Sequence, residues 1–285
     1  MSFDLFFYKR KNSNITCDDI SNYLTRKLTS PNEDEYQWFF ENDRTEVYYF
    51  FEKNDPAGEF YEGFENTGFV FNLNYARPEF FGLEAFDFVT YFVNDLDLYV
   101  INPQTSKAAP HKPGKTELFQ TWNKANLYAC SQFNNEQSVY LPPDLTNAIW
   151  VHNYNVKRMQ YELGAEYFVS KAFFFKKSDG GTPVTLSIWT EHFPNVLPVT
   201  DYYVLARKYK RFFKTIKEVI LLSKEDFNAK FSSYFEAYKY PDTIIIHHEK
   251  AKAAAALFNK VRTDLNFEKE LIRVPADLIL NIPAS

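Results

Sequence analysis

The sequence has few of the residues that mark several common classes of protein. It contains 8 glycines in 285 residues, and none of them forms a GxGxxG or GxxxxGK[ST] loop that would cradle a phosphate group. Its two cysteines, Cys17 and Cys130, are too few for a disulfide framework and form no CxxC pair. We therefore expect neither a nucleotide-binding loop nor a fold held by disulfides.

Motifs of common hydrolases and metalloproteins are missing as well. The sequence has no HExxH, GxSxG, SxxK or EF-hand pattern. Three of its five histidines, His111, His152 and His192, are scattered without the spacing of a ligand set. We predict a protein without enzymatic activity, cofactor or bound metal.

Long hydrophobic runs are also absent. No stretch reaches the roughly 18 consecutive apolar residues of a membrane-spanning helix. The opening residues, MSFDLFFYKRK, lack the charged lead and small-residue cleavage site of a secretory signal. Two isolated cysteines fit a reducing compartment. We expect a cytoplasmic protein that makes no use of a membrane.

Aromatic residues, by contrast, are abundant. The chain has 30 Phe, 20 Tyr and 4 Trp, and such a number of rings predicts that some of them lie at the surface. Exposed Tyr and Trp side chains are favoured anchors in protein interfaces.

The net charge of −5 is unevenly distributed along the chain. Residues 31–66 contain 11 acidic residues but only two basic ones, Arg44 and Lys53. A field of one sign steers an oppositely charged partner and speeds its encounter. The alternative interpretation is a solvated acidic loop without a partner.

The segment 45–66, TEVYYFFEKNDPAGEFYEGFEN, combines both features. Alternation in VYYFF predicts a strand with Val47, Tyr49 and Phe51 on one face, well inside a sheet. Residues 53–68 contain proline and three glycines, which predicts a loop. Exposed rings in this loop would favour a binding surface, and buried rings would make the acids a solvated rim.

The first third of the chain has a regular order of elements. A capping-box pattern, Thr16 with Asp19, predicts a helix start. The expected elements are a strand at 3–8, a helix from 17, a hairpin or long bent strand over 37–52, a strand at 69–75, a helix opened by Pro78 and a strand at 98–101. This order resembles a ferredoxin-like β-α-β-β-α-β unit.

Residues 102–118 contain three prolines and a glycine, a composition typical of a linker. We predict an acidic α+β domain over 1–103, a linker over 104–118 and a mixed α/β domain over 119–285. In the last region, Asp179-Gly180-Gly181 predicts a hairpin turn, and later strands alternate with helices, which favours a partly parallel sheet.

Two other segments offer alternative functions. His247 and His248 follow a predicted strand, at the edge where catalytic groups gather in open α/β sheets. Adjacent strand residues point to opposite faces, however, which argues against one shared metal ion. An enzyme with a site near these histidines is one alternative.

Residues 207–217, RKYKRFFKTIK, alternate basic and aromatic residues, as nucleic-acid surfaces do. We expect a basic helix here. The acidic chain as a whole makes nucleic acid an unlikely partner, and the helix could instead complement the acidic stretch 31–66, within one chain or across a homodimer.

Several of these features together resemble bacterial toxin-immunity proteins: the SFDLFFYK opening, the missing catalytic motifs, the many rings and the concentrated acidic loop. These families contain small to mid-sized α/β proteins that bind a cognate toxin and block its active site. The resemblance implies a tight complex with a protein toxin and no chemistry.

Under this hypothesis the acidic loop would mimic the anionic substrate of a basic toxin, such as a nuclease, and its rings would anchor the complex. The predicted partner-binding residues are Glu52, Asp55, Glu59, Phe60, Tyr61, Glu62, Phe64 and Glu65.

Overall fold

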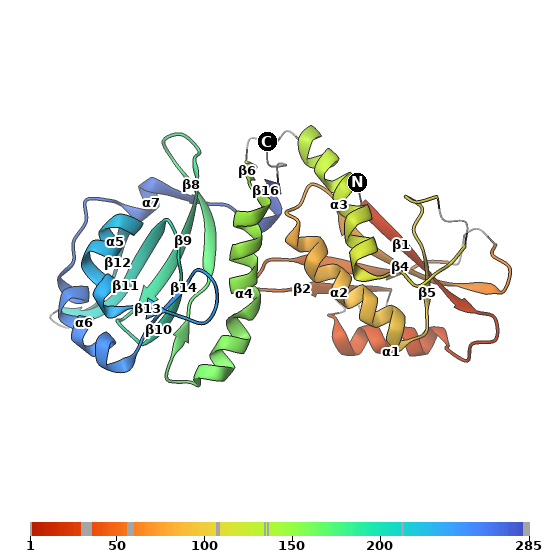
Figure 1. Ribbon diagram of the computed structural model, residues 1–285, viewed down its shortest axis with the longest axis horizontal. Coiled ribbons are helices and arrows are strands. Elements are labelled where there is room, and N and C mark those ends of the chain that lie inside the picture. Colours follow the sequence, from red (N-terminus) through yellow and green to blue (C-terminus); the bar gives the residue numbers. More distant parts are fainter. Residues whose placement is uncertain are drawn as a thin grey trace. The chain divides into compact units, whose positions relative to one another are not determined.

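The computed structural model describes residues 2–29, 36–55, 60–106, 109–133, 135, 137–211 and 214–281, with only the backbone for 209–211 and 214–216. The chain is a mixed α+β protein that divides into two compact units (Figure 1). The first unit comprises Met1–Asn135 with Leu280–Ser285, and the second comprises Glu136–Ile279. None of the described helices is both long and apolar enough to cross a membrane.

The first unit is built on one five-stranded sheet of order β2-β3-β4-β1-β5, in which all neighbouring strands are antiparallel. Its elements are β1 (Ser2–Arg10), α1 (Cys17–Lys27), β2 (Gln37–Glu41), β3 (Tyr48–Lys53), β4 (Phe64–Asn74), α2 (Phe80–Asp95), β5 (Tyr99–Ile101) and α3 (Lys115–Gln132). The predicted capping box at α1 is confirmed, since Thr16 and Asp19 exchange both hydrogen bonds.

One face of this sheet forms an aromatic core with α2. Tyr49 and Phe51 on β3 are buried, as the alternation in VYYFF predicts. Phe51 stacks on Phe7 of β1 at 5.8 Å, and Phe92 of α2 meets Phe7 edge-on at 4.9 Å. The predicted hairpin over 37–52 is also confirmed, since β2 and β3 pair directly.

The predicted loop over 53–68 is wrong at its end. β4 begins at Phe64, because the end of β1 supplies a strand for it: Arg10 pairs with Phe64 and Lys9 with Glu65. This partner is 54 residues away in the sequence, and local composition does not reveal it.

The first unit extends past residues 104–118. These residues lie within it, and Lys115–Leu118 begin α3. Helix α3 packs on α2, where the buried Trp122 covers Gly82 so closely that a Cβ at Gly82 would lie 2.6 Å from the indole. Burial of Leu118 and Trp122 therefore ties the chain after the proline-rich segment to the first unit.

The second unit contains two mixed sheets, of order β12-β11-β9-β8-β15 and β13-β14-β10-β7. Its elements are β6 (Val139–Leu141), α4 (Pro143–Leu163), β7 (Phe168–Val169), β8 (Ala172–Lys177), β9 (Pro183–Thr190), β10 (Asn195–Pro198), β11 (Tyr202–Arg211), β12 (Lys214–Ser223), α5 (Lys224–Phe231), η1 (Ser232–Tyr234), β13 (Glu236–Ala237), β14 (Thr243–Ile246), α6 (His248–Lys260), α7 (Phe267–Glu270), β15 (Leu271–Arg273) and η2 (Ala276–Leu278). The chain then enters β16 (Ile279–Asn281).

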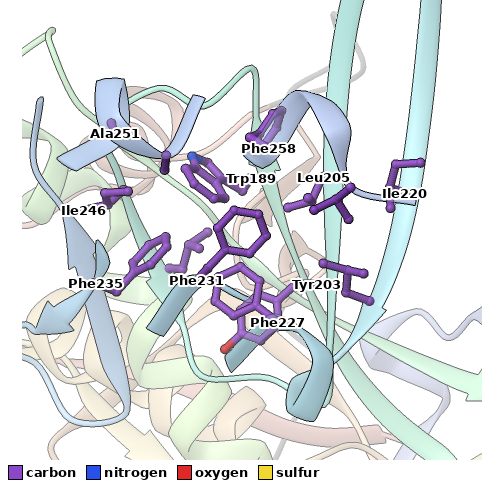
Figure 2. Close-up of a cluster of buried hydrophobic side chains, with 14 residues drawn as sticks. Trp189, Tyr203, Leu205, Ile220, Phe227, Phe231, Phe235, Ile246, Ala251 and Phe258 are labelled. Carbon is purple, nitrogen blue, oxygen red and sulfur yellow. The ribbon is translucent and has the colours of Figure 1, made fainter. Parts of the chain in front are cut away.

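Two strand pairs of the second unit, β9–β11 and β7–β10, are parallel. The strands that alternate with helices, β12 and β14, instead pair antiparallel with their neighbours and lie in different sheets, so the alternation predicted parallel pairing for the wrong strands. The predicted hairpin joins β8 to β9, and Gly181 has the positive φ of 71° that favours glycine. Figure 2 shows the main core, in which Trp189 meets Phe231, Phe235 and Phe258 edge-on at 4.8–5.3 Å.

The predicted basic helix over 207–217 is wrong. These residues belong to the antiparallel hairpin of β11 and β12, with pairs from Arg207–Glu218 to Arg211–Lys214. Strand β11 also pairs with β9 along Tyr202–Ala206. The antiparallel pairing of β11 with β12 therefore overrides the helical propensity of Lys and Arg in this segment.

Candidate functional site

The turn that precedes β4 in the first unit contains or adjoins five of the predicted partner-binding residues: Phe60, Tyr61, Glu62, Phe64 and Glu65. Within this turn the amide of Phe64 donates to the carbonyl of Tyr61 at 3.1 Å, and Gly63 has φ +79° at the third position. Such a turn requires a positive φ there, so glycine is the favoured residue. The amide of Lys11 donates to the Gly63 carbonyl at 3.1 Å, which fastens the turn to the end of β1.

The three rings of the turn differ in exposure. Phe60 is 77% exposed. Tyr61 is half-buried and meets Tyr8 edge-on at 5.3 Å. Phe64 is half-buried and meets Tyr99 edge-on at 5.0 Å. Phe60 is therefore an exposed ring, whereas its two neighbours present only part of their surface to solvent.

Cations at the end of β1 lie over these rings: Arg10 is its last residue, and Lys11 follows it. The ammonium of Lys11 is 4.7 Å from the centre of the Phe60 ring. The guanidinium of Arg10 is 5.1 Å from the centre of Phe64 and 5.0 Å from that of Tyr99, and its Nε donates to the Tyr99 hydroxyl at 3.1 Å. Such contacts are attractive because the ring face is electronegative. We define Arg10, Lys11, Phe60, Tyr61, Phe64 and Tyr99 as the ring–cation surface.

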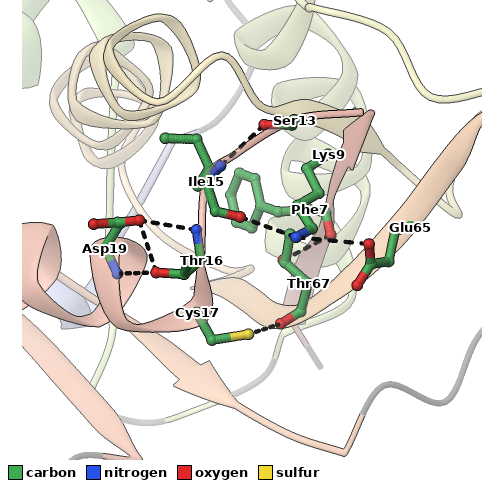
Figure 3. Close-up of polar contacts among 9 residues, drawn as sticks. All are labelled: Phe7, Lys9, Ser13, Ile15, Thr16, Cys17, Asp19, Glu65 and Thr67. Carbon is green, nitrogen blue, oxygen red and sulfur yellow. Dashed lines mark hydrogen bonds and ion pairs between the residues drawn. The ribbon is translucent and has the colours of Figure 1, made fainter. Parts of the chain in front are cut away.

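A third cation, Lys9 of β1, neutralises the charge of Glu65. The ammonium of Lys9 lies 3.6 Å from the Glu65 carboxylate and donates to the Ile15 carbonyl at 2.9 Å (Figure 3). Lys9 thus ties the start of β4 to the segment before α1. Nearby, the Cys17 thiol donates to the Thr67 carbonyl, with 3.8 Å between sulfur and oxygen.

Only some of the remaining predicted acids lie near the ring–cation surface. Glu62 and Asp55 are exposed, and Glu59 lies outside the described residues. Glu52 accepts a hydrogen bond from Asn54 at 3.0 Å and pairs with Val70 in β4. Since Val70 is five residues from Glu65, Glu52 lies about 16 Å along the strand from it. Glu52 is therefore separate from the ring–cation surface.

The sequence prediction of a purely acidic surface missed Lys9, Arg10 and Lys11. The three cations stand together at the end of a predicted strand, which is a visible signal. Their position opposite Phe64 and Glu65 depends on the register of β1 against β4, and this register is set by tertiary pairing.

No protein-family model, curated protein or solved structure matches this chain.

A second arrangement of functional side chains lies in the second unit, at the end of β14. The Tyr167 hydroxyl is 2.7 Å from Nδ1 of His247, and Nε2 of His247 is 3.1 Å from the Glu236 carboxylate. A carboxylate accepts, so Nε2 carries a proton, and in the neutral imidazole Nδ1 accepts the phenol proton. Tyr167, His247 and Glu236 therefore form a hydrogen-bonded chain, which we call the Tyr–His–Glu chain.

The two adjacent histidines meet one ring. The expectation that they point to opposite faces of a strand is wrong, because β14 ends at Ile246 and α6 begins at His248. The ring centres of His247 and His248 lie 5.8 Å and 5.0 Å from that of Tyr167. Among the described residues no group of three His, Cys, Asp or Glu side chains is placed to hold a metal ion.

Arg207, the first arginine of the basic segment 207–217, is buried within the second unit. The side chain of Arg207 is 3% exposed, and its Nε donates to the Glu218 carboxylate at 2.8 Å. Its other nitrogens donate to the carbonyls of Phe258 and Val261, at the end of α6. Arg207 is therefore a structural residue, and it leaves the nucleic-acid alternative without one of its six cations.

Proposed function

We propose that this chain is a protein-binding module that docks through the ring–cation surface, and that its partner is a bacterial toxin that it neutralises as an immunity protein. The observation that carries the proposal is the exposure of Phe60. A large apolar ring held on an ordered turn gains much by burial in a complex, since a fully buried Phe is worth about 1.5–3 kcal/mol relative to an exposed one.

The surroundings of Phe60 suit a protein partner. Aromatic and Arg side chains are enriched at the centres of protein interfaces, and Arg10, Phe64 and Tyr99 of the same surface lie together. The cation Lys11 is already over one face of Phe60, so a partner would cover the opposite face.

The acids have a different role in this proposal from the one first expected. Glu62 and Asp55 are exposed and form a rim that steers a basic partner during encounter. Glu65, which is paired with Lys9, mainly holds the turn in place. Occlusion of the toxin's active site would then depend on the rings for affinity and on the acids for the rate of association.

We also propose that the first unit is a ferredoxin-like β-α-β-β-α-β unit. The support for it is the strand order β5-β1-β4-β3 with antiparallel neighbours, to which β2 adds an edge strand. Such a unit holds the end of β1 between β4 and β5, which is where Arg10, Phe64 and Tyr99 meet.

The experiment is a binding measurement with the product of the neighbouring gene or, where that product does not bind, with the protein captured in a pull-down on the purified chain. Calorimetry should show that Phe60→Ala raises the dissociation constant by more than about tenfold, the effect of an interface hot spot. Tyr161→Ala is the matched control, because Tyr161 is an 88% exposed ring in the second unit. Equal affinity of Phe60→Ala and wild type would refute the proposed surface.

A second measurement separates the effect of the acidic residues on the association rate from the effect of the rings on affinity. Reversal of Asp55 and Glu62 to lysine, with Glu65 and its Lys9 partner left intact, should slow association and reduce its salt dependence. An association rate that stays unchanged would remove the electrostatic part of the proposal, while the result for Phe60 would still decide the surface.

The Tyr–His–Glu chain supports a second candidate function, an enzyme whose reactive group is the Tyr167 phenol. An imidazole that accepts the phenol proton and is itself oriented by a carboxylate is the arrangement that activates hydroxyl nucleophiles. An aryl sulfonyl fluoride that labels nucleophilic tyrosines tests it. Tyr167 should be labelled faster than the more exposed Tyr161, and His247→Ala should abolish this difference. Faster labelling of Tyr161 would sink the candidate.

A further inference from the structure

A cavity opens at the surface of the second unit, apart from both arrangements described above. Its volume is about 200 Å³. One wall is a face of α4 with Ile149 and His152, and the others come from β9, the loop after β10, the start of α5 and the turn before β14. Its lining residues are Leu145, Ala148, Ile149, His152, Thr185, Pro198, Val199, Thr200, Asp201, Lys224, Pro241 and Asp242.

Charged residues of both signs line this cavity. They are Asp201, Lys224 and Asp242, from three separate segments. Backbone bonds of 2.8 Å hold the segments together: the Lys224 amide donates to the Asp201 carbonyl, and the Val199 amide donates to the Asp242 carbonyl. Among the described residues the side chains of Lys224 and Asp242 form no hydrogen bond or ion pair.

Asp201 is held in place with one oxygen to spare. Its Oδ2 accepts from the amide and the hydroxyl of Thr185, at 2.7 Å and 2.8 Å. Neither of these bonds uses Oδ1, and a carboxylate has lone pairs on both oxygens. Asp201 can therefore accept a further donor while it stays fixed by Thr185.

At the floor of the cavity two acceptors, Nδ1 of His152 and the carbonyl of Pro241, share a single donor. His152 is 96% buried, and its Nε2 must donate to the Ser170 carbonyl at 2.8 Å, since a carbonyl only accepts. In the neutral ring Nδ1 then accepts, and its neighbour is the Thr243 hydroxyl at 3.3 Å. That hydroxyl also contacts the Pro241 carbonyl at 2.9 Å. One hydroxyl proton serves two acceptors, so either His152 or Pro241 has room for another donor.

We propose that this cavity binds a small free α-amino acid. The ligand's ammonium group would donate to Asp201, Asp242 and the acceptor on the floor, and its carboxylate would pair with Lys224, the cation of the lining. The volume of about 200 Å³ suits a molecule of this size.

Thermal-shift and calorimetric titrations test the proposal on the full-length chain, with each standard free L-amino acid as the probe. At least one should raise the midpoint of thermal unfolding, because a ligand that binds only the folded state stabilises it. Its N-acetyl derivative lacks the ammonium and its methyl ester lacks the carboxylate, and neither should produce the shift.

Two variants link the binding to this cavity. Asp242→Asn and Lys224→Gln should each raise the dissociation constant about tenfold, the effect of losing a charge-assisted hydrogen bond. Asn tolerates the positive φ of 46° at position 242, and Gln suits the first turn of α5, so both variants should fold. Asp264→Asn and Lys252→Gln, which change the same charges at exposed positions outside the lining, should leave the constant unchanged.

Three results would overturn the proposal: no shift with any amino acid, equal binding of the methyl ester, or equal affinity of Asp242→Asn and wild type. None of these outcomes depends on the ring–cation surface, which belongs to the first unit.

Discussion

The ammonium group of Lys11 lies 4.7 Å from the centre of the Phe60 ring, yet the ring is 77% exposed. A cation–π contact at such an exposed site contributes about 0.5–1 kcal/mol, which is less than Phe60 would gain by burial. Phe60 is thus held in position by its neighbour while most of its apolar area stays in water.

The first prediction concerns the stability of this arrangement. Phe60→Ala should change the free energy of unfolding by less than about 1 kcal/mol, because few contacts are lost. Phe51→Ala in the core of the same sheet should lower it by about 3–5 kcal/mol. Urea denaturation followed by tryptophan fluorescence measures both. A loss for Phe60→Ala as large as that for Phe51→Ala would mean that Phe60 belongs to the core.

The second prediction concerns Gly82 in the first turn of α2. Glycine to alanine in a helix normally stabilises it by about 1 kcal/mol. Here the new Cβ would lie 2.6 Å from the Trp122 indole, which is fully buried and cannot move away. We expect Gly82→Ala to destabilise the protein by about 1–3 kcal/mol.

Circular dichroism during thermal unfolding shows whether Gly82→Ala lowers or raises the stability. Gly180→Ala is the control, since no atom lies within 4 Å of a Cβ there. In the background of Trp122→Leu the penalty of Gly82→Ala should shrink, because the clashing ring is gone. A stabilising effect of Gly82→Ala alone would show that α3 does not pack on α2 this closely.

The third prediction concerns Arg207, which joins the β11–β12 hairpin to the end of α6. Arg207→Met should lower the free energy of unfolding by about 3 kcal/mol, since Glu218 and two helix-end carbonyls lose their donors. Lys208→Met, which removes an exposed positive charge at the next position, should have almost no effect. Similar stability of the two variants in urea would contradict the structural role of Arg207.

The fourth prediction concerns pH. Burial lowers the pKa of His152 from the ordinary value of 6.5, so the folded protein binds fewer protons than the unfolded chain below that pH. Stability therefore falls as the pH drops from 6.5 towards the lowered pKa, by up to about 1.4 kcal/mol per pH unit for this one proton. Above pH 6.5 His152 is neutral in both states and adds no pH dependence.

Denaturation at a series of pH values, compared between wild type and His152→Gln, isolates this contribution from that of the carboxylates. The variant should lose less stability on acidification. His248→Gln, which removes an exposed histidine, should keep the wild-type dependence. Parallel curves for wild type and His152→Gln would show that the histidine is not buried in its neutral form.

The parts of the fold that the sequence predicts correctly depend on neighbours within a few residues. Three such features are each specified by residues within one short segment: the Thr16–Asp19 capping box, the turn at Asp179–Gly181 and the alternation through Val47, Tyr49 and Phe51. Hydrogen bonds across one helical turn and the alternation of side chains along a strand need no distant partner.

What only the tertiary structure decides involves partners far apart in the sequence. Residues 207–211 and 214–217 contain good helix formers, and they form strands because β11 pairs with β12. His247 and His248 meet Tyr167, which is 80 residues from His247. Sheet pairing and burial depend on which segments meet, and the free energy of those contacts exceeds local propensity.

The segment 45–66 has features that the sequence predicts and features that only the tertiary structure decides. Its composition alone indicates a strand followed by an acidic turn that contains rings. The register of β4 against β1 places Lys9 opposite Glu65 and Arg10 opposite Phe64, and this turns an acidic loop into a surface of mixed charge. The sequence by itself thus determined which side chains are present at this surface. The pairing of two strands 54 residues apart decided which charges and rings lie together, because hydrogen bonding between strands sets every cross-strand neighbour at once.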